Sequence, residues 1–491
     1  MMQEQIYDIV VIGSGPGGRT VSLRSVKNGF SVALVESELF GGDCHYWACV
    51  PSKALLRPPE ALTEARRVEG ARQAVVGNLG VESVLERRDS LVDHWNDARV
   101  MKSLAETGIH VMHGHGRLDG RKRVAVTSAS GNNNTVLTAR HAVVLSMGSS
   151  PAIPDDVPGL AQAKPWTSRD ATSTKKVPKR LAIIGDGPVA CEMADAWSAL
   201  GAKVTILSIN ERMLDRYESF VGEQLAAAFA KRGISIHTKV NVTRVKRSNK
   251  KKAPTIEIEL NDGSTMDTDE LLVAVGRKPN TGDIGLETVG LKPQQWLDVD
   301  DTFLVRGINE NDWLYAVGDI NHRALLTHIG KYQGRVCAKA ILERARGRTS
   351  MNADDDQAAE SSRSVAKADH HMVPQVIFTD PQVASVGLTE RDAKSLGLNI
   401  RSVDSEIGEV DGAQLKADGY IGHARLVIDE DKHVIVGATF LGPEVSDLLH
   451  SATVAIVGQV PIDRLWHAVP SFPTVSEVWT QLLEDGFYPY T

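Results

Sequence analysis

Residues 7–18 have the sequence YDIVVIGSGPGG. Within this stretch Ile9–Ile12 is a continuous apolar and β-branched run, which is typical of a strand buried on both faces of a parallel sheet. Glycines follow in the spacing G-x-G-x-x-G, and a helical pattern continues to about Asn28. Residues 31–35 then predict a second strand, which ends at Glu36. This order of strand, glycine-rich turn, helix and strand is typical of a dinucleotide-binding fold.

Each residue of the motif has a physical role in binding a dinucleotide. Gly13 allows the tight turn after the strand, Gly15 lets the backbone approach a pyrophosphate, and Gly18 lets the helix pack closely on the strand. The N-terminus of the helix favours the negative charge of the phosphates. Glu36, at the end of the second strand, can bind ribose hydroxyl groups.

A second unit of the same kind begins at residue 180. Residues 180–184 predict a strand, a helix continues to about Leu200, and residues 203–207 predict the next strand. The turn between the first strand and the helix contains Gly185 and Gly187, and Ala190 stands at the place of the third glycine. Two dinucleotide folds in one chain indicate two dinucleotides, most simply a flavin and a nicotinamide.

The composition restricts the class of protein. A chain of 491 residues suggests about three domains, and 42% hydrophobic with 24% charged residues is ordinary for a globular protein. The net charge of −7 excludes a whole-protein basic field for nucleic acid. No apolar run approaches the roughly 18 residues of a membrane span, and the first residues do not form a secretory signal. Four cysteines cannot form a disulfide scaffold, so we expect a reducing, cytoplasmic location.

Two polar segments stand apart from these patterns. Residues 246–252 are basic and lie between two strand-like runs. Because aromatic residues are not interleaved with the basic ones, they predict a solvated loop rather than a nucleic-acid site. Residues 346–371 are polar and predict a flexible insertion.

Residues 41–53, GGDCHYWACVPSK, contain two cysteines, Cys44 and Cys49. On a regular helix five residues turn about 140°, so the sulfurs would point apart and a bridge requires a distorted turn between them. A helix N-terminus near Cys49 would favour its thiolate. A zinc site is disfavoured, because Cys191 and Cys337 are isolated and supply no second pair. The motif therefore indicates a redox pair or two unrelated buried cysteines.

With these motifs the chain resembles the class I pyridine nucleotide-disulfide oxidoreductases, a family that includes dihydrolipoamide dehydrogenase, glutathione reductase and mercuric reductase. The resemblance extends along nearly the whole chain. Further segments that are similar to motifs of this family are residues 142–154 with Gly148, 275–280 with Gly276 and Arg277, 314–319 with Gly318 and Asp319, 376–381, and 386–390.

The resemblance implies an α/β fold with two Rossmann-like dinucleotide-binding domains and a C-terminal α+β dimerisation domain. The implied boundaries are 1–160 for FAD, 161–282 for NAD(P), 283–345 for a return to the central FAD domain, 346–371 for the flexible insertion and 372–491 for the dimer interface. The implied cofactor-binding residues are Gly13, Gly15, Gly18, Glu36, Gly42, Lys53, Gly148, Gly318, Asp319, Gly185, Gly187, Ala190, Ser208, Arg212, Gly276 and Arg277.

The resemblance also implies a path for electrons, from NAD(P)H to FAD, then to a Cys44–Cys49 disulfide and then to a substrate. By position, Cys49 would lie next to the flavin and Cys44 would attack the substrate. Lys53 matches the lysine near the flavin, and Glu192 matches its acidic partner. A cation beside the flavin is physically reasonable, because it stabilises the anionic reduced ring.

The chain departs from the family pattern near its C-terminus. Dimeric members carry a histidine there that acts as acid and base for the partner subunit's thiol, and a glutamate that orients it. Here Glu477 matches the glutamate, but Phe472 stands at the histidine position, and phenylalanine cannot move a proton. His467 and His45 are the alternative bases. The bulky His45-Tyr-Trp47 should also restrict access by a large disulfide; a similar His-Trp occurs in the soluble transhydrogenase branch, which lacks the intact cysteine pair.

The choice of nicotinamide cofactor follows from the end of the second strand in the second unit. An acidic residue there would favour NAD and repel the 2′-phosphate of NADP, but Ser208 occupies that place. Ala190 replaces the third glycine as in NADP-type members, and Arg212 could meet a phosphate. We therefore expect NADPH, with NADH as a possible second donor.

These observations favour a homodimeric FAD enzyme that takes hydride from NAD(P)H and reduces a small or planar acceptor, such as a quinone or a pathway intermediate. One alternative is a true disulfide reductase, including dihydrolipoamide dehydrogenase, that uses His45 or His467 as its base. Another is a flavoprotein subunit without turnover, although the intact cysteine pair, Lys53 and Glu192 argue against it. No nucleic-acid partner, metal or membrane span is expected.

Overall fold

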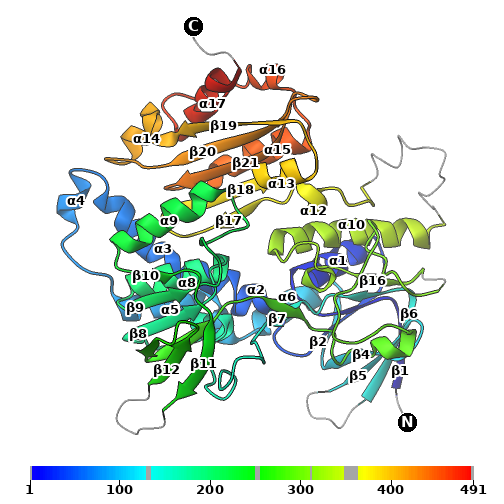
Figure 1. Cartoon of the computed structure of the whole chain (residues 1–491). Coiled ribbons are helices and arrows are strands. Elements are labelled where there is room, and N and C mark those ends of the chain that lie inside the picture. The colour runs from blue at the N-terminus through cyan, green and yellow to red at the C-terminus, as the bar shows by residue number, and fades with distance from the viewer. Residues whose placement is uncertain (1–2, 129–133, 249–254, 310–311, 348–362, 488–491) are drawn as a thin grey trace. The chain divides into compact units, whose positions relative to one another are not determined.

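The computed structural model describes residues 3–128, 134–248, 255–309, 312–347 and 363–487. The chain divides into two compact units, and Figure 1 labels their helices and strands. The first unit consists of residues 1–50, 89–151 and 276–370, and the second of residues 51–88, 152–275 and 371–491.

The first unit is built on a seven-stranded sheet with the order β3-β2-β1-β6-β5-β4, in which β16 also pairs with β6. Strands β1, β2, β3, β6 and β16 run parallel, whereas β4 and β5 form an antiparallel edge. The bounds are β1 Gln3–Ile12, β2 Val32–Glu36, β3 His110–His113, β4 His115–Leu118, β5 Arg123–Thr127, β6 Asn134–Leu145 and β16 Leu314–Ala316. A separate pair joins β7 (Ser149–Pro151) to β15 (Arg277–Pro279).

The predicted strand over Ile9–Ile12 is the buried part of a longer one. Strand β1 starts at Gln3, because it pairs with β6 from Gln3 opposite Thr135 to Ile12 opposite Leu145. The apolar run packs against helices α1 (Pro16–Lys27), α6 (Ala98–Glu106) and α10 (Thr327–Ala345) in one hydrophobic core. In Figure 1, α1 and α10 lie side by side over the sheet.

The second unit contains the second dinucleotide fold. Its parallel sheet has the order β10-β9-β8-β14, with β8 at Arg180–Ile184, β9 at Lys203–Leu207, β10 at Ser235–His237 and β14 at Glu270–Val273. The predicted strands over 180–184 and 203–207 are confirmed. Helices α8 (Pro188–Ala199) and α9 (Ser219–Lys231) belong to this fold, and an antiparallel meander follows, of β11 Val242–Arg247, β12 Ile256–Leu260 and β13 Thr265–Thr268.

The C-terminal part of the second unit is an antiparallel sheet with the order β17-β18-β21-β20-β19. Its strands are β17 Gln375–Ile377, β18 Gln382–Gly387, β19 Ile400–Glu406, β20 His423–Asp429 and β21 Val434–Gly442. Its helices are α13 Glu390–Ser395, α14 Asp411–Lys416, α15 Leu449–Val457, α16 Ile462–Leu465 and α17 Val478–Phe487. Two Rossmann-like sheets and a C-terminal α+β domain together confirm the predicted fold class.

Residues 51–88 pack with the second unit. They contain most of α3 (Cys49–Arg66), α4 (Ala71–Ala74) and most of α5 (Val81–Leu91). Leu55, Leu56 and Val84 share a hydrophobic core with Trp197 of α8, so this stretch belongs to the second unit. The remaining helices are α2 Gly42–Tyr46, α7 Ser168–Ser173 and α12 Ala368–His371.

The structure describes only parts of the two polar segments, residues 246–252 and 346–371. Much of the predicted basic loop over 246–252 lies outside the described residues, and so does most of the predicted flexible insertion. The end of that insertion is packed rather than loose, because Ala366 and Asp369 are buried in the first unit. No described helix has the length and apolar character that crossing a membrane requires.

Candidate active site

The first glycine-rich turn is a tight junction between β1 and α1. A Cβ atom on Gly18 would lie 2.0 Å from the carbonyl oxygen of Gly13, so only glycine permits this packing. Glu36 braces the turn, because its Oε2 accepts hydrogen bonds of 2.8 Å from the backbone N–H and the hydroxyl of Ser14. The Glu36 carboxylate thus reaches the turn from the end of the neighbouring strand.

A partly buried polar network connects four of the predicted motifs in the first unit. Arg277 donates to Asp43 Oδ2 over 2.9 Å and to Ser149 Oγ over 2.7 Å, and the Ser149 hydroxyl donates to Asp319 Oδ2 over 2.5 Å. Burial raises the pKa of Asp319, while Ser149 and Arg277 act in the opposite direction. The structure therefore brings Arg277, Asp319 and the loop after Gly148 together beside the cysteine motif.

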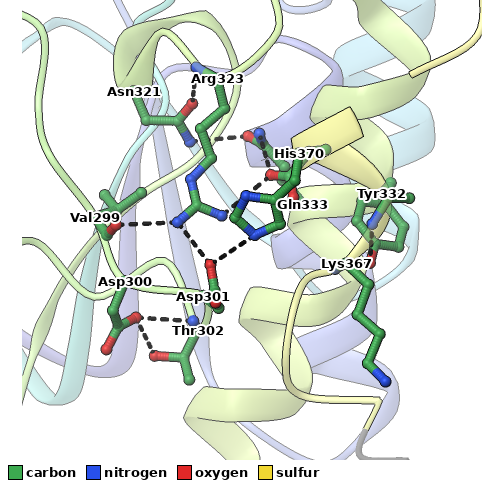
Figure 2. Close-up of polar contacts among 12 residues, drawn as sticks. Val299, Asp300, Asp301, Thr302, Asn321, Arg323, Tyr332, Gln333, Lys367 and His370 are labelled. Carbon is green, nitrogen blue, oxygen red and sulfur yellow. Dashed lines mark hydrogen bonds and ion pairs between the residues drawn. The ribbon is translucent and has the colours of Figure 1, made fainter. Parts of the chain in front are cut away.

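A second network supports the turn that carries Gly318 and Asp319, and sequence reasoning missed it. Gln333 on α10 accepts hydrogen bonds from the Gly318 N–H (2.7 Å) and from the Asn321 amide (3.0 Å), and it donates to Asp369 Oδ2 over 3.0 Å. Figure 2 shows the neighbouring Arg323, which donates to the Val299 carbonyl and pairs with Asp301.

Replacing Gln333 with leucine is expected to lower the free energy of unfolding by about 3 kcal/mol, because a buried N–H, an amide and a carboxylate lose their partner at once. The Gly318–Asp319 turn should loosen with it, so the variant should also release FAD faster. Denaturant unfolding and the rate of FAD loss on gel filtration check this result. Gln295→Leu, at an exposed site in the same unit, is the matched control; equal effects in both variants would contradict the bracing role.

The two cysteines meet at a break between two helices. Cys44 lies in α2, Cys49 is the first residue of α3, and the chain leaves helical geometry at Trp47, where φ is −136°. This break is the distorted turn that a Cys44–Cys49 contact requires. No disulfide joins the two sulfurs in this structure. A hydrogen bond to Cys49 raises the pKa of the Cys44 thiol, and so does burial.

The first turn of α10 also contacts the cysteine pair. Thr327 Oγ1 lies 3.3 Å from Cys49 Sγ. Thr327 and the nearby charge of Lys331 lower the pKa of Cys44, against the effects of Cys49 and burial. Neither residue is signalled in the sequence near the cysteine motif, because both come from a helix almost 300 positions away along the chain.

His45, one of the two candidate bases, is directed to a carboxylate. Its Nε2 lies 3.3 Å from Asp93 Oδ2, and Asp93 is also paired with Arg99 at 2.7 Å. The turn that supplies Asp93 is strained, because Asp93, His94 and Trp95 all have left-handed φ values, of 51°, 49° and 57°.

Lys53 and Glu192 form an ion pair in the second unit. Lys53 Nζ lies 2.6 Å from Glu192 Oε2, and the Glu192 side chain is only 7% exposed. The other carboxylate oxygen accepts a 3.0 Å hydrogen bond from the backbone N–H of Phe378, whose ring centroid is 5.0 Å from Lys53 Nζ. The structure therefore brings these two predicted residues together and adds Phe378 to them.

The second glycine-rich turn carries a carboxylate that the sequence analysis did not use. Asp186 lies between Gly185 and Gly187, and its Oδ2 accepts hydrogen bonds from the Ser208 hydroxyl and from Asn210 Nδ2 (2.9 Å). Arg212 lies close to two other carboxylates, at 3.4 Å from Asp215 and 3.9 Å from Glu223. Ala190 is fully buried where α8 packs on the sheet.

Phe472 and the candidate base His467 lie on an exposed loop of the second unit. Phe472 is 72% exposed, and His467 is exposed as well. Glu477 caps its own turn, where its Oε1 accepts hydrogen bonds from the backbone N–H groups of Thr474 (2.8 Å) and Gly412 (3.2 Å). Phe472 thus presents an exposed aromatic ring on this loop, and within the chain Glu477 serves this turn.

The chain is similar to known proteins along most of its length. Residues 7–336 match the family described as pyridine nucleotide-disulphide oxidoreductase, and residues 373–483 match its dimerisation domain. A mercuric reductase of Staphylococcus aureus is 28% identical, over 96% of this chain and 81% of its own length. A dihydrolipoyl dehydrogenase of Chlamydia pneumoniae is 29% identical, over 97% of this chain and 96% of its own.

A solved structure has the same fold. The HOCl-induced flavoprotein disulfide reductase RclA from Escherichia coli, solved as a Cu(II) complex, superposes with a TM-score of 0.81 at 21% identity, over 98% of this chain and 99% of that one. The family's members typically bind FAD, use NAD(P)H and carry a redox-active disulfide, and the dimerisation domain implies a homodimer. With both models matched over most of its length, the chain belongs to the pyridine nucleotide-disulphide oxidoreductase family of enzymes.

Proposed function

We propose that the protein is an FAD-dependent NAD(P)H oxidoreductase that passes electrons through Cys44 and Cys49 to a small or planar acceptor, such as a quinone or a pathway intermediate. The supporting observation is the cysteine pair itself, which meets at a helix break with Thr327 Oγ1 3.3 Å from Cys49 Sγ. FAD, when bound, supplies the chemistry of accepting a hydride and passing its two electrons to a disulfide.

The residues of the first unit fit FAD. Gly15 begins α1 without a side-chain cap from any described residue, so the first backbone N–H groups of this helix are directed outward for a pyrophosphate. A Cβ at Gly15 would meet nothing within 4 Å, which leaves room for a ligand at the backbone. Glu36 would bind the ribose, and Asp319 with the glycines Gly42, Gly148, Gly276 and Gly318 would line the rest of the site.

The nicotinamide would bind the second unit, at the N-terminus of α8, which Gly187 begins in the same way. We infer a modest preference for NADPH over NADH. Ser208 removes the carboxylate that would repel a 2′-phosphate at the end of β9. The Asp186 carboxylate beside Ser208, and the two acids around Arg212, reduce the advantage of the phosphate.

The four catalytic positions divide into a thiol pair and an ion pair. Cys49, next to the Thr327 hydroxyl, is proposed as the thiolate that interacts with the flavin, and Cys44 as the thiol that reaches the acceptor. Lys53 is proposed to stabilise negative charge on the reduced ring, with Glu192 fixing its position through the 2.6 Å ion pair. The backbone N–H of Phe378 in turn fixes Glu192.

The nature of the acceptor follows from the missing base. His45 is bonded to Asp93, and His467 lies on the exposed loop, so neither of the two candidate bases has a hydrogen bond to Cys44 among the described contacts. In a homodimer, Phe472 would close the partner subunit's site in place of the proton donor, with Glu477 beside it. An aromatic wall suits a planar acceptor better than a thiol that needs acid–base help.

We assign a role to each segment within the predicted boundaries. Residues 1–160 and 283–345 would bind FAD, residues 161–282 would bind NAD(P), residues 346–371 would be an insertion, and residues 372–491 would form the dimer interface. Exposed apolar side chains in the last segment, including Val454, Val457, Val469 and Phe472, support its role as an interface. We also propose the cytoplasm as the location, since a thiol pair that cycles with NADPH suits a reducing compartment.

The experiment that tests the proposal is an anaerobic titration with NADPH and, separately, with NADH, followed by assays with quinones, lipoamide, glutathione disulfide and a second pyridine nucleotide. Uptake of four electrons per subunit, and turnover with quinones, are expected. Lipoamide reduction at roughly 10–10³ per second, the range of good enzymes, would instead establish a true disulfide reductase with another base.

Replacing Phe472 with alanine is expected to raise the KM for the acceptor by about tenfold, the effect of losing one aromatic contact, while the rate of flavin reduction by NADPH stays unchanged. Steady-state and anaerobic stopped-flow kinetics separate the two quantities. Leu396→Ala, which is 55% exposed elsewhere in the C-terminal domain, is the control. Phe472→His should gain lipoamide reduction; a slower flavin reduction in Phe472→Ala would count against the proposed place of the ring.

A further inference from the structure

Helices α1 and α10 pack closely at the end where the cysteines lie. A Cβ atom on Gly334 would come within 2.7 Å of the Gly17 carbonyl oxygen and 2.9 Å of the Thr20 Cβ, so the two helices touch backbone to backbone. Figure 1 shows the two helices side by side. The side chains from the first two turns of both helices therefore gather in one small region of the first unit.

Lys331 comes from the second turn of α10. Thr327 at the start of the helix contacts Cys49, and Lys331 stands four residues later on the same helical face. Its side chain is exposed, and its charge opposes the larger effects of Cys49 and burial, which raise the pKa of Cys44. It forms no ion pair with any described carboxylate.

Arg19 comes from the second turn of α1 and is partly buried. Burial lowers the pKa of its guanidinium, and the nearby Tyr46 and Cys44 act in the opposite direction. Among the residues that the structure describes, no carboxylate pairs with Arg19 either. Two cations without a counter-charge of their own thus act on the same sulfur.

Two acidic side chains near Cys44 are paired with arginines. Asp43, next to Cys44 in the sequence, pairs with Arg277 at 2.9 Å. Asp93 pairs with Arg99 at 2.7 Å and lies 3.3 Å from His45. These two acids are therefore paired with other cations, and neither is a counter-charge for Arg19 or Lys331.

We propose that the acceptor that reaches Cys44 is an anion, a small molecule bearing a carboxylate, sulfonate or phosphate group that Arg19 and Lys331 bind. The inference rests on the proposed function, whose acceptor it narrows to an anionic one. Arg19 offers a planar fork of donors for such a group, and Lys331 offers a point charge. In the reaction the two thiols become a disulfide, and two electrons and two protons pass to the acceptor.

The test compares two alkylating reagents on the reduced holoenzyme, iodoacetate and iodoacetamide. They attack the same thiolate and differ in charge, so the ratio of their rates at Cys44 reports the local field and not the thiol pKa. The holoenzyme is reduced with dithiothreitol and desalted anaerobically, and Cys44 modification is followed by peptide mass spectrometry. Arg24→Gln, five residues along α1, and Lys339→Gln, two turns along α10, are matched controls.

The rate ratio of iodoacetate to iodoacetamide should fall about threefold in Arg19→Gln or Lys331→Gln and about tenfold in the double variant, and both controls should keep the native ratio. The same variants should lose the preference for 1,2-naphthoquinone-4-sulfonate over 1,2-naphthoquinone in kcat/KM, and salt should weaken that preference in the native enzyme. An unchanged alkylation ratio in the double variant, or a native preference for the neutral quinone, would overturn the proposal.

The two proposals fail in different ways. Dithiothreitol prepares the thiols without NADPH, so the alkylation ratio can be read even if NADPH does not reduce the cysteine pair. A failed NADPH titration with an intact ratio would reject the proposed function and retain the anion site. Normal NADPH reduction with a ratio that the double variant leaves unchanged would reject the anion site alone.

Discussion

Replacing Cys49 with serine is expected to abolish the long-wavelength absorbance band of the half-reduced enzyme and to lower acceptor turnover by at least about a thousandfold, as removal of a reacting group does in other enzymes. The band requires a thiolate in contact with the flavin, and a hydroxyl does not ionise at neutral pH as a thiol beside a helix N-terminus does. Cys49 begins α3 and lies 3.3 Å from the Thr327 hydroxyl, which can donate to a thiolate.

The measurement is an anaerobic NADPH titration followed by absorbance, with acceptor assays on the same preparations. Cys44→Ser should separate the two roles, because it should keep the band from Cys49 and lose turnover. Cys337→Ala, which removes a buried cysteine far from the motif in the sequence, is the control and should behave as native. A native protein that takes up only two electrons and shows no band would mean that the pair is structural.

Replacing Lys53 with methionine is expected to slow flavin reduction by NADPH by about 10²- to 10³-fold, the range for losing one group that stabilises developing charge. The reduced flavin is anionic, and Lys53 is the proposed cation beside it. The change also leaves Glu192, which is 7% exposed, with only the Phe378 N–H for its charge, so negative potential near the ring increases.

Anaerobic stopped-flow measurement of flavin bleaching tests this expectation, and the flavin reduction potential should fall in parallel. Lys231→Met, at an exposed position in the last turn of α9, is the matched control. Glu192→Gln should slow the reaction less than Lys53→Met, because Lys53 keeps its charge in that variant. Native rates and an unshifted potential in Lys53→Met would remove Lys53 from the proposed machinery.

The local order of residues determined both dinucleotide folds. The apolar runs at Ile9–Ile12 and 180–184, each followed by glycines at fixed spacing, predicted strand, turn and helix correctly, because buried parallel strands and tight turns depend on neighbouring residues. The full length of β1 was not predictable in this way. Its polar start at Gln3 is a strand only because β6, more than 120 residues later, pairs with it.

The sequence also predicted two cysteines as a redox pair, and the family resemblance, rather than any local pattern, predicted a Lys53–Glu192 pair. The structure forms that ion pair, and the catalytic roles of the four residues stay a proposal. What only the tertiary structure decided is the surroundings of these groups. Thr327 and Lys331 act on the cysteines because α10 packs against α1, and Asp93 contacts His45 from a strained turn. Such contacts join residues tens to hundreds of positions apart, and no spacing rule within a segment encodes them, because they depend on how whole helices and sheets pack together.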